Sequence, residues 1–368
     1  MCAVLLPLMA ASGLEAAEKV PQYALDTSWP KLPLPNQWAL GLVNGIHVDT
    51  HNHLWMFHSP ELVPNYALGA AKDPPSTPCC KPAPAIIEFD AKGNVLRAWG
   101  GPQEAKGYDW PSAGHGIYVD YKGNIWIGGS QTRTGQDGSP PDGMFLKFDP
   151  DGKFLLQIGG RGPSKGSVDT TLLSGASAVD VDPATNEVFI ADGYGNHRVI
   201  VFDADTGAFK RQWGAYGKPP TDEKLPRWNG EGKPPQQFNL VHCIRIANDG
   251  KVYVCDRLNN RIQVFQKDGT FVAEYVYKPT TGGSGAVGNV SLWPNRQQTF
   301  MVMNDPGNFN TVIVNRADGR ELSRFGHYGT WAGEYHRNHQ MEFDRDGNIY
   351  TSEDYRVQKL KIVNGVRP

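Results

Sequence analysis

The chain has 368 residues, a formal net charge of −2 and 11% aromatic residues. This length suffices for one large domain or two ordinary ones, each with a full hydrophobic core. The near-neutral charge gives no reason to expect nucleic acid as a partner, and the sequence has no stretch of the length and apolarity that span a bilayer. Its 42 glycines and high aromatic content favour an all-β protein with many turns.

The N-terminal stretch resembles the apolar part of a secretory signal. Residues 3–17 read AVLLPLMAASGLEAA, which is apolar with small residues at its end, although the usual preceding positive charges are missing. We expect residues 1–17 to be a signal peptide and the protein to be periplasmic or secreted. If this stretch is not a signal, the expected location is the cytoplasm.

A hairpin pattern repeats along the rest of the chain. Alternating apolar residues flank tight Gly- or Asn-containing turns in six units, which begin at Gly45, His115, Ala178, His242, Asn289 and His339. Each complete unit holds four short strands, as in a blade of a β-propeller. The sixth unit lacks its fourth strand, and residues 23–29 (YALDTSW) are available to supply it. Residues 18–368 are therefore predicted to form one six-bladed β-propeller domain, closed by an N-terminal strand.

Loop lengths distinguish the two faces of this predicted ring. The long connections cover residues 59–85, 130–143, 214–240, 277–288 and 325–338, and alternation of strand direction puts all of them on one face, here called the loop face. The short turns lie on the opposite face, here called the turn face. Because binding residues concentrate on loops carried by a rigid scaffold, the loop face is the expected functional side.

Histidines recur at one position of the predicted repeat. Alignment of the innermost strands gives one residue per blade: Asn44, His115, Ser177, His242, Gly288 and His339. Three imidazoles from alternate blades would surround the axis. Three histidines that leave one position open are typical of catalytic zinc, although iron, cobalt or nickel also suit such ligands.

Two loops are expected to direct further side chains toward this metal. The loop ADGYGNHR of the third blade carries Tyr194, and the loop VCDRLNNR of the fourth carries Asp256 and Arg257. A metal ion and an arginine nearby would both favour phenolate, so that Tyr194 could act as a general base. The Asp–loop–Arg pattern is equally consistent with a structural pair across strands.

Five cysteines do not form an evident disulfide framework. Cys79 and Cys80 are adjacent and either form a vicinal disulfide or none. Cys243 and Cys255 lie on facing strands of one hairpin, where we favour two small buried hydrophobic residues over a disulfide.

The repeats are of the NHL type, and the motifs GHGIYVD, ADGYGN, VHCIRI, VCDR and NHQMEFD together resemble the peptidyl-α-hydroxyglycine α-amidating lyase family over residues 38–363. The resemblance implies that zinc is held by His115, His242 and His339. It implies a tyrosine base at Tyr194 and a substrate-binding arginine at Arg257. It also implies a structural calcium ion at the carbonyl groups of Ile46 and Ile117 and at the side chain of Gln340.

This sequence departs from the family pattern at two positions. Ser59 follows a Phe-His pair where the family has an arginine that binds substrate, and Gln340 offers an amide where the family has a carboxylate. We expect His58, Ser59 and Asp256 to contact the residues that hold the metal, without contacting the metal themselves. His336 is the replacement ligand if the register of His339 is wrong.

The favoured function is a zinc-dependent lyase that cleaves a C–N or C–O bond in a carbinolamide-type small molecule or short peptide. A metal-dependent hydrolase of lactones or esters, acting through a zinc-bound hydroxide, is an alternative, although the triple histidine differs from the carboxylate and amide ligands of gluconolactonase-like propellers. A non-catalytic binding propeller is the third reading. The remaining histidines His47, His51 and His53 are predicted to be structural and to lie on or near the turn face.

Overall fold

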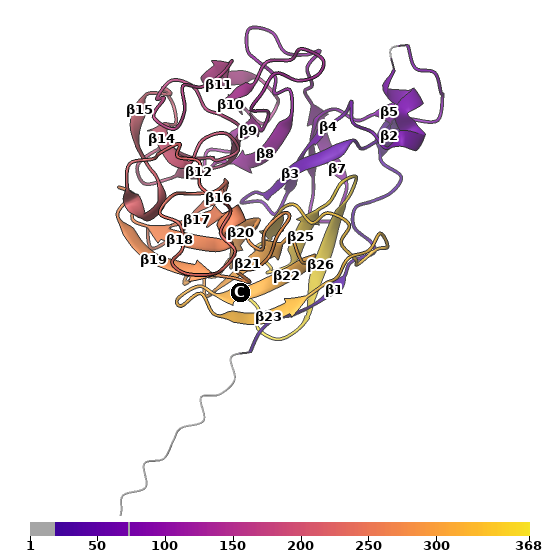
Figure 1. Ribbon diagram of the computed structural model, residues 1–368. Coiled ribbons are helices and arrows are strands. Elements are labelled where there is room, and N and C mark those ends of the chain that lie inside the picture. The colour runs from indigo at the N-terminus through magenta and orange to yellow at the C-terminus, as the bar shows by residue number, and fades with distance from the viewer. Residues whose placement is uncertain (1–18, 73) are drawn as a thin grey trace, which may run out of the picture.

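Six antiparallel four-stranded sheets surround a central channel in the computed structural model, which describes residues 19–72 and 74–368 (Figure 1). The predicted six-bladed, all-β propeller is confirmed. Residues 1–17, the predicted signal peptide, lie outside the described residues. No helix in the described ranges has the length and apolar character needed to cross a membrane.

The first three blades follow one another along the chain, each running from its channel strand outward. Blade 1 consists of β3 (Leu42–Val48), β4 (Leu54–Ser59), β6 (Ile86–Phe89) and β7 (Val95–Trp99). Blade 2 consists of β8 (Gly114–Val119), β9 (Ile125–Gly129), β10 (Asp142–Phe148) and β11 (Phe154–Arg161). Blade 3 consists of β12 (Ala176–Asp182), β13 (Glu187–Asp192), β14 (Arg198–Asp203) and β15 (Phe209–Trp213).

The last three blades complete the ring. Blade 4 consists of β16 (Val241–Ile246), β17 (Val252–Asp256), β18 (Arg261–Phe265) and β19 (Phe271–Val276). Blade 5 consists of β20 (Asn289–Leu292), β21 (Phe300–Asp305), β22 (Asn310–Asn315) and β23 (Glu321–Phe325). Blade 6 consists of β24 (Met341–Phe343), β25 (Ile349–Ser352), β26 (Val357–Asn364) and the N-terminal β1 (Gln22–Leu25). Strand β1 pairs with β26, with Leu25 opposite Leu360, so the expected N-terminal closure is confirmed (Figure 1).

The hydrophobic core is divided among the six junctions between neighbouring blades. Six clusters of buried side chains each combine residues of two adjacent blades. Between blades 3 and 4, for example, Trp213 packs between Phe189 and Phe265, with ring centroids 6.2 and 5.9 Å away. Each blade is thus held by its neighbours, and the ring forms a rigid frame for groups at the channel.

Irregular pairing shapes the channel strands of blades 1 to 4. In each of them the register shifts by one residue, and the extra residues are Asn44, Gly116, Ser177 and His242. Such a β-bulge bends the strand and redirects the neighbouring side chain. The bulges therefore lie at or beside the positions where the sequence places the histidines.

A second ring of polar side chains lies three residues further along the same strands, toward the turn face. It lines a cavity of about 520 Å³ and consists of His47, Tyr118, Asp180, Arg245, Ser291 and Glu342. The Arg245 guanidinium pairs with Glu342, and Ser291 Oγ donates a hydrogen bond to Glu342 at 2.9 Å. The Asp180 carboxylate accepts a hydrogen bond from the Ile246 N–H at 2.8 Å. These groups satisfy one another, as buried charges must.

The smaller elements lie outside the blades. A two-stranded parallel sheet, β2 (Trp38–Ala39) and β5 (Lys81–Pro82), stands beside blade 1 in Figure 1. The short 3₁₀ helices are η1 (Pro35–Gln37), η2 (Asn65–Ala71), η3 (Ala215–Gly217) and η4 (Arg257–Asn259).

Both cysteine pairs form disulfides. Cys79 is bonded to Cys80, and Cys243 is bonded to Cys255. The preference for Cys243 and Cys255 as unpaired hydrophobic residues was wrong. The bulge at His242 shifts the register of the β16–β17 hairpin, and this shift places the two cysteines directly opposite each other.

Candidate metal centre

The channel strands bring His115, His242 and His339 together at the loop-face end of the channel. Their ring nitrogens lie within 4.8 Å of one another, and the residues are 4%, 1% and 6% exposed. His115 and His242 are the second residues of β8 and β16. His339 lies two residues before β24, and its N–H donates to the Ser352 carbonyl. The predicted convergence of three imidazoles from alternate blades is present in the structure.

Backbone carbonyl groups fix the orientation of two of these rings. His115 Nδ1 lies 2.8 Å from the Ser177 carbonyl oxygen, and His242 Nδ1 lies 2.6 Å from that of Gly288. A carbonyl oxygen only accepts, so both Nδ1 atoms carry the proton and both Nε2 atoms keep their lone pairs. In each case the carbonyl belongs to the equivalent position of the next blade. Metal-ligating histidines are typically oriented by such a bond.

The spacing of the nitrogens fits a single metal ion. His339 Nε2 lies 3.1 Å from His115 Nε2. Two nitrogen ligands of one tetrahedral zinc ion lie about 3.3 Å apart, because each bond measures about 2.0–2.1 Å. Burial lowers the pKa of His115 to about 3 and lowers those of His242 and His339 as well, which keeps the rings neutral, as ligands must be. This buried triad could therefore hold a metal ion.

Tyr194 reaches the same point from the loop between β13 and β14. Its hydroxyl lies 3.0 Å from His115 Nε2 and 3.1 Å from His242 Nε2. Gly175, with φ of +65°, makes room for the tyrosine, because a Cβ there would lie 2.7 Å from Tyr194 Cβ. The single phenol proton can be donated to only one of these two nitrogens at a time. The lone pair of the other nitrogen therefore faces the phenol oxygen, and a cation between them would stabilise this arrangement.

Without a metal ion, the surroundings of Tyr194 raise its pKa rather than lower it. Burial raises this pKa, and the positive charges of Arg257 and Arg337 only oppose that effect. A phenolate at Tyr194 therefore requires a further positive charge beside it, such as a divalent ion on the histidines.

Arg257 approaches Tyr194 from η4 in blade 4. Its Nη1 lies 3.4 Å from the Tyr194 hydroxyl, and its Nε donates to the Ser284 carbonyl at 2.7 Å. Asp256, the preceding residue, is instead engaged within its own blade. Its carboxylate binds the Arg261 guanidinium at 2.7 Å and Asn259 Nδ2 at 2.7 Å. This is the structural Asp–Arg pair that the sequence left open as an alternative.

The other predicted supporting residues lie in blade 1 and do not contact the triad directly. His58 is fully buried; its Nδ1 accepts from the Gly41 N–H at 3.1 Å, and its Nε2 donates to the Pro84 carbonyl at 2.9 Å. Ser59 Oγ accepts from Asn44 Nδ2 at 2.9 Å. His336 is exposed and bonds Asp354 through Nδ1 at 2.7 Å, so His339 rather than His336 completes the triad.

The residues predicted to bind calcium do not fit that ion. The Gln340 side-chain oxygen accepts a hydrogen bond from the Ile46 N–H at 2.9 Å, so it is directed at a backbone donor. Calcium sites in proteins are built from several oxygens, usually including carboxylates. Ile46, Ile117 and Gln340 supply no negative charge, and Gln340 instead links blade 6 to blade 1.

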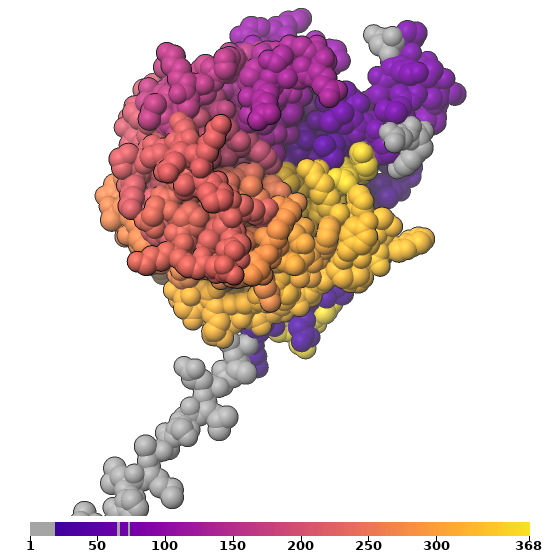
Figure 2. All heavy atoms as spheres, viewed as in Figure 1, coloured from indigo at the N-terminus to yellow at the C-terminus, as the bar shows by residue number. Residues whose placement is uncertain are grey.

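A cavity of about 540 Å³ opens beside the triad on the loop face. Its wall includes Tyr194, His242, Arg257 and His339, together with Arg337, which the sequence reasoning missed. Arg337 lies in the long connection between blades 5 and 6, two residues before His339. Residues 214–240, salmon in Figure 2, cover another part of this face.

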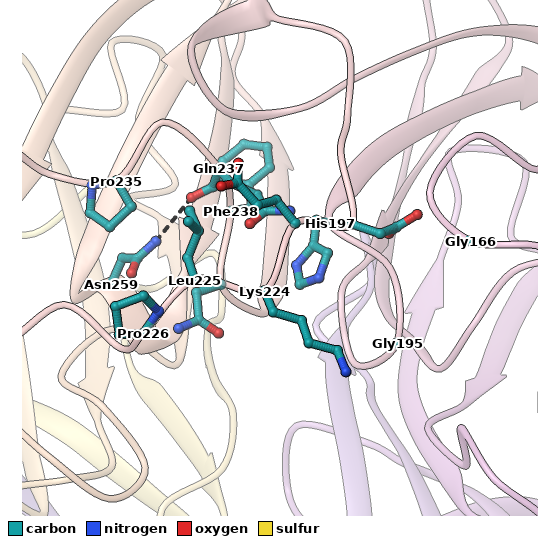
Figure 3. Close-up of a pocket in the computed structure, with 13 residues that line it drawn as sticks. Gly166, Gly195, His197, Lys224, Leu225, Pro226, Pro235, Gln237, Phe238 and Asn259 are labelled. Atoms are coloured by element: carbon teal, nitrogen blue, oxygen red, sulfur yellow. Dashed lines mark hydrogen bonds between the residues drawn. The ribbon is translucent and has the colours of Figure 1, made fainter.

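A second hollow on the loop face, of about 450 Å³, is drawn in Figure 3. It is lined by Gly195, Asn239 and Asn259, whose chain neighbours Tyr194, Leu240 and Leu258 line the cavity beside the triad. Three loops thus separate the two hollows. The labelled His197 and Lys224 side chains lie in the second hollow, and no triad histidine lines it (Figure 3).

One further group of metal-capable side chains lies near the turn face among the described residues. It consists of Asp49, His53 and Glu88. Each is already engaged, since His53 Nδ1 lies 2.7 Å from Glu88, Glu88 pairs with Arg97 at 2.7 Å, and Asp49 accepts hydrogen bonds from its own turn. These contacts agree with the structural role predicted for His53.

The sequence is similar to two kinds of known protein. A family model described as NHL repeat matches residues 238–265. Peptidyl-glycine alpha-amidating monooxygenase B from Xenopus laevis is 28% identical over 254 residues, which are 68% of this chain and 25% of that protein. NHL repeat-containing protein 3 from Homo sapiens is 28% identical over 251 residues, 67% of this chain and 57% of that protein. The predicted resemblance to NHL-repeat propellers and amidating enzymes is confirmed, and the chain spans about a quarter of the length of the Xenopus enzyme.

Solved structures support the fold alone. A streptogramin B lyase superposes with a TM-score of 0.50 and 15% identity, covering 94% of this chain and 87% of that chain. Virginiamycin B lyase from Staphylococcus aureus gives a TM-score of 0.50 and 12% identity, covering 94% of this chain and 100% of that chain.

Proposed function

We propose that this propeller is a metal-dependent lyase that cleaves N-acylated α-hydroxyglycines or similar small carbinolamides. The observation that carries the proposal is the convergence of three neutral imidazoles with the Tyr194 hydroxyl, 3.0 and 3.1 Å from two of their nitrogens. The similarity to amidating monooxygenases over 68% of this chain supports it. Zinc is the proposed metal, because three nitrogen ligands with one open position suit it, although other divalent transition metals share this preference.

In this proposal, side chains of the protein transfer one proton and orient the substrate. A zinc ion on the three histidines would supply positive charge that acidifies the substrate hydroxyl and Tyr194. Tyr194, as phenolate, takes the proton of the carbinol hydroxyl. The O–H electron pair then forms the C=O bond while the C–N bond breaks, and the proton passes from Tyr194 to the departing amide nitrogen. The products are an amide and an aldehyde, so atoms and electrons balance.

Turnover of a defined substrate tests this proposal. Purified protein is incubated with N-benzoyl-α-hydroxyglycine, and benzamide is measured by chromatography. Tyr194→Phe should lower kcat by about 100-fold or more, the usual contribution of a general base, while leaving the bound metal in place. Tyr121→Phe, at an exposed tyrosine on the turn face, should leave the rate unchanged. Absence of benzamide from the metal-loaded wild-type protein would contradict the proposal.

A second candidate function is a non-catalytic binding propeller. It is favoured by the 28% identity to NHL repeat-containing protein 3, whose name states no activity. The two candidates differ in what Tyr194 does. A binding protein that uses the triad for structure would convert no carbinolamide, whether or not the Tyr194 hydroxyl is present.

We also propose that the protein works outside the cytoplasm. Two disulfides, Cys79–Cys80 and Cys243–Cys255, suit an oxidising compartment. Mass spectrometry of the mature protein from its native host tests this. A start near residue 18 and two oxidised pairs are expected, whereas a full-length chain with free thiols would contradict export.

A further inference from the structure

Positive side chains collect around the cavity beside the histidines. Arg257 and Arg337 both line it, from blade 4 and from the connection before blade 6. A third arginine, Arg227, donates to the carbonyl oxygens of Gly283 at 2.7 Å and Thr281 at 3.1 Å, and so holds the loop whose Ser284 carbonyl binds Arg257. Burial and the charge of Arg257 lower the pKa of Arg227, which places these guanidinium groups within electrostatic reach of each other.

Negative charge in this cavity is scarce. Among the described lining residues, Asp354 is the one carboxylate. Its Oδ2 binds His336 Nδ1 at 2.7 Å, and its Oδ1 accepts from Arg337 Nη1 at 3.1 Å. The hydrogen bonds of Arg257 go to the Ser284 carbonyl and the Tyr194 hydroxyl, which are uncharged. The cavity therefore carries net positive charge and suits an anionic ligand.

We propose that Arg337 binds the anionic group of the substrate, a carboxylate next to the carbinol carbon, together with Arg257. This inference rests on the proposed lyase function and adds a specificity-determining residue to it. Arg337 would take the place of the substrate-binding arginine that Ser59 leaves missing in blade 1. Ser59 itself is 5% exposed and bonded to Asn44, and it offers no charge.

The geometry of Arg337 suits this role. Its side chain is 44% exposed, and Asp354 holds it through one terminal nitrogen, so the rest of the planar fork faces the cavity or solvent. It lies two residues before His339 and lines the same cavity as His242 and His339, so its charge is close to the candidate metal centre. A guanidinium fork matches a carboxylate in two parallel hydrogen bonds, which a lysine ammonium cannot reproduce.

Binding of a non-reactive carboxylate tests the assignment separately from catalysis. N-Benzoylglycine lacks the carbinol hydroxyl, and its methyl ester lacks the charge. Titration calorimetry on the metal-loaded protein should show that Arg337→Gln weakens binding of N-benzoylglycine by about 10- to 100-fold, the loss expected for a hydrogen bond to a charged group. The affinity for the ester should be unchanged, and Arg337→Lys should fall between wild type and Arg337→Gln.

Arg345→Gln, at an exposed arginine on the turn face, is the matched control and should leave both affinities unchanged. Equal losses for acid and ester in Arg337→Gln, no loss for either, or a wild-type protein that does not bind N-benzoylglycine would overturn the assignment. If the wild type binds N-benzoylglycine through Arg337 but does not cleave N-benzoyl-α-hydroxyglycine, the lyase proposal fails and the assignment of Arg337 stands.

Discussion

Two rings of side chains, three residues apart along the same six strands, lie at the two ends of the propeller channel. Their buried polar groups differ in whether they are paired with one another. At the turn-face end, the Arg245 guanidinium is matched by the carboxylates of Asp180 and Glu342, and the ring satisfies itself. At the loop-face end, His115 and His242 present lone pairs toward each other and toward the Tyr194 hydroxyl. The groups of the turn-face ring pair with one another, whereas the loop-face ring could hold a cation. Burial alone therefore does not mark a functional site; the marker is convergence of unmatched atoms.

Replacing one histidine at each end should produce the largest contrast. His242→Ala should weaken zinc binding by more than about 100-fold, since even residues behind metal ligands contribute about 10- to 100-fold. The control is His47→Ala. His47 lies on the channel strand of blade 1, three residues after the position that corresponds to the triad histidines, and its replacement should leave zinc affinity unchanged. Titration calorimetry of the metal-depleted proteins measures both values. Similar losses in the two variants would remove the distinction between the rings.

Breaking the turn-face ring should affect stability instead. Arg245→Met leaves Asp180 and Glu342 as buried carboxylates without their cation, and we expect the free energy of unfolding to fall by about 3–5 kcal/mol. Denaturant unfolding of the metal-loaded protein gives this number, and metal content should stay at the wild-type level. Replacing Asp180, Arg245 and Glu342 together by apolar residues should cost far less. A loss of metal in Arg245→Met would mean that the two rings are coupled.

A buried histidine with satisfied nitrogens provides a third comparison. Burial lowers the pKa of His58 to about 4, so the folded protein keeps it neutral while the unfolded chain binds a proton below about pH 6.5. Stability should therefore fall as the pH drops from about 6.5 to about 4, by about 3 kcal/mol from this residue. Urea unfolding across this range should show a shallower acid decline in His58→Gln. An identical pH profile in the variant would show that His58 is not held neutral.

The disulfide beside the triad should have the smallest effect. Cys243 follows His242 in β16. Its disulfide partner Cys255 lies 12 residues further along the chain, in a hairpin whose two strands are already hydrogen-bonded to each other. Changing both cysteines to alanine should lower the free energy of unfolding by about 2 kcal/mol, with metal content unchanged. Thermal unfolding with and without reductant provides the measurement. A complete loss of metal would show that the disulfide orients His242.

The sequence predicted the features that repeat. Apolar alternation and turn chemistry recur in every blade, so the ring, its closure by β1 and the shared position of His115, His242 and His339 followed from alignment of the units. The site residues that lie on the repeat were found for the same reason.

What the sequence did not predict depends on local irregularity. The pairing of Cys243 with Cys255 depends on a one-residue bulge, because without it Cys243 would face Val254. Arg337 stands two residues before His339 in a connection whose length and sequence differ from blade to blade, so the repeat pattern did not single it out. The pKa of Tyr194 follows from a balance between burial and two arginines, which only the three-dimensional arrangement defines.

Elemental analysis of the purified protein shows most directly whether His115, His242 and His339 form a metal site. The protein is grown with zinc in the medium, alongside a variant in which all three histidines are alanine and alongside Arg245→Met. We predict close to one transition-metal ion per chain in the wild type and in Arg245→Met, and none in the triple variant. Wild-type protein without a transition metal, or a triple variant that retains it, would mean that these histidines do not form a metal site.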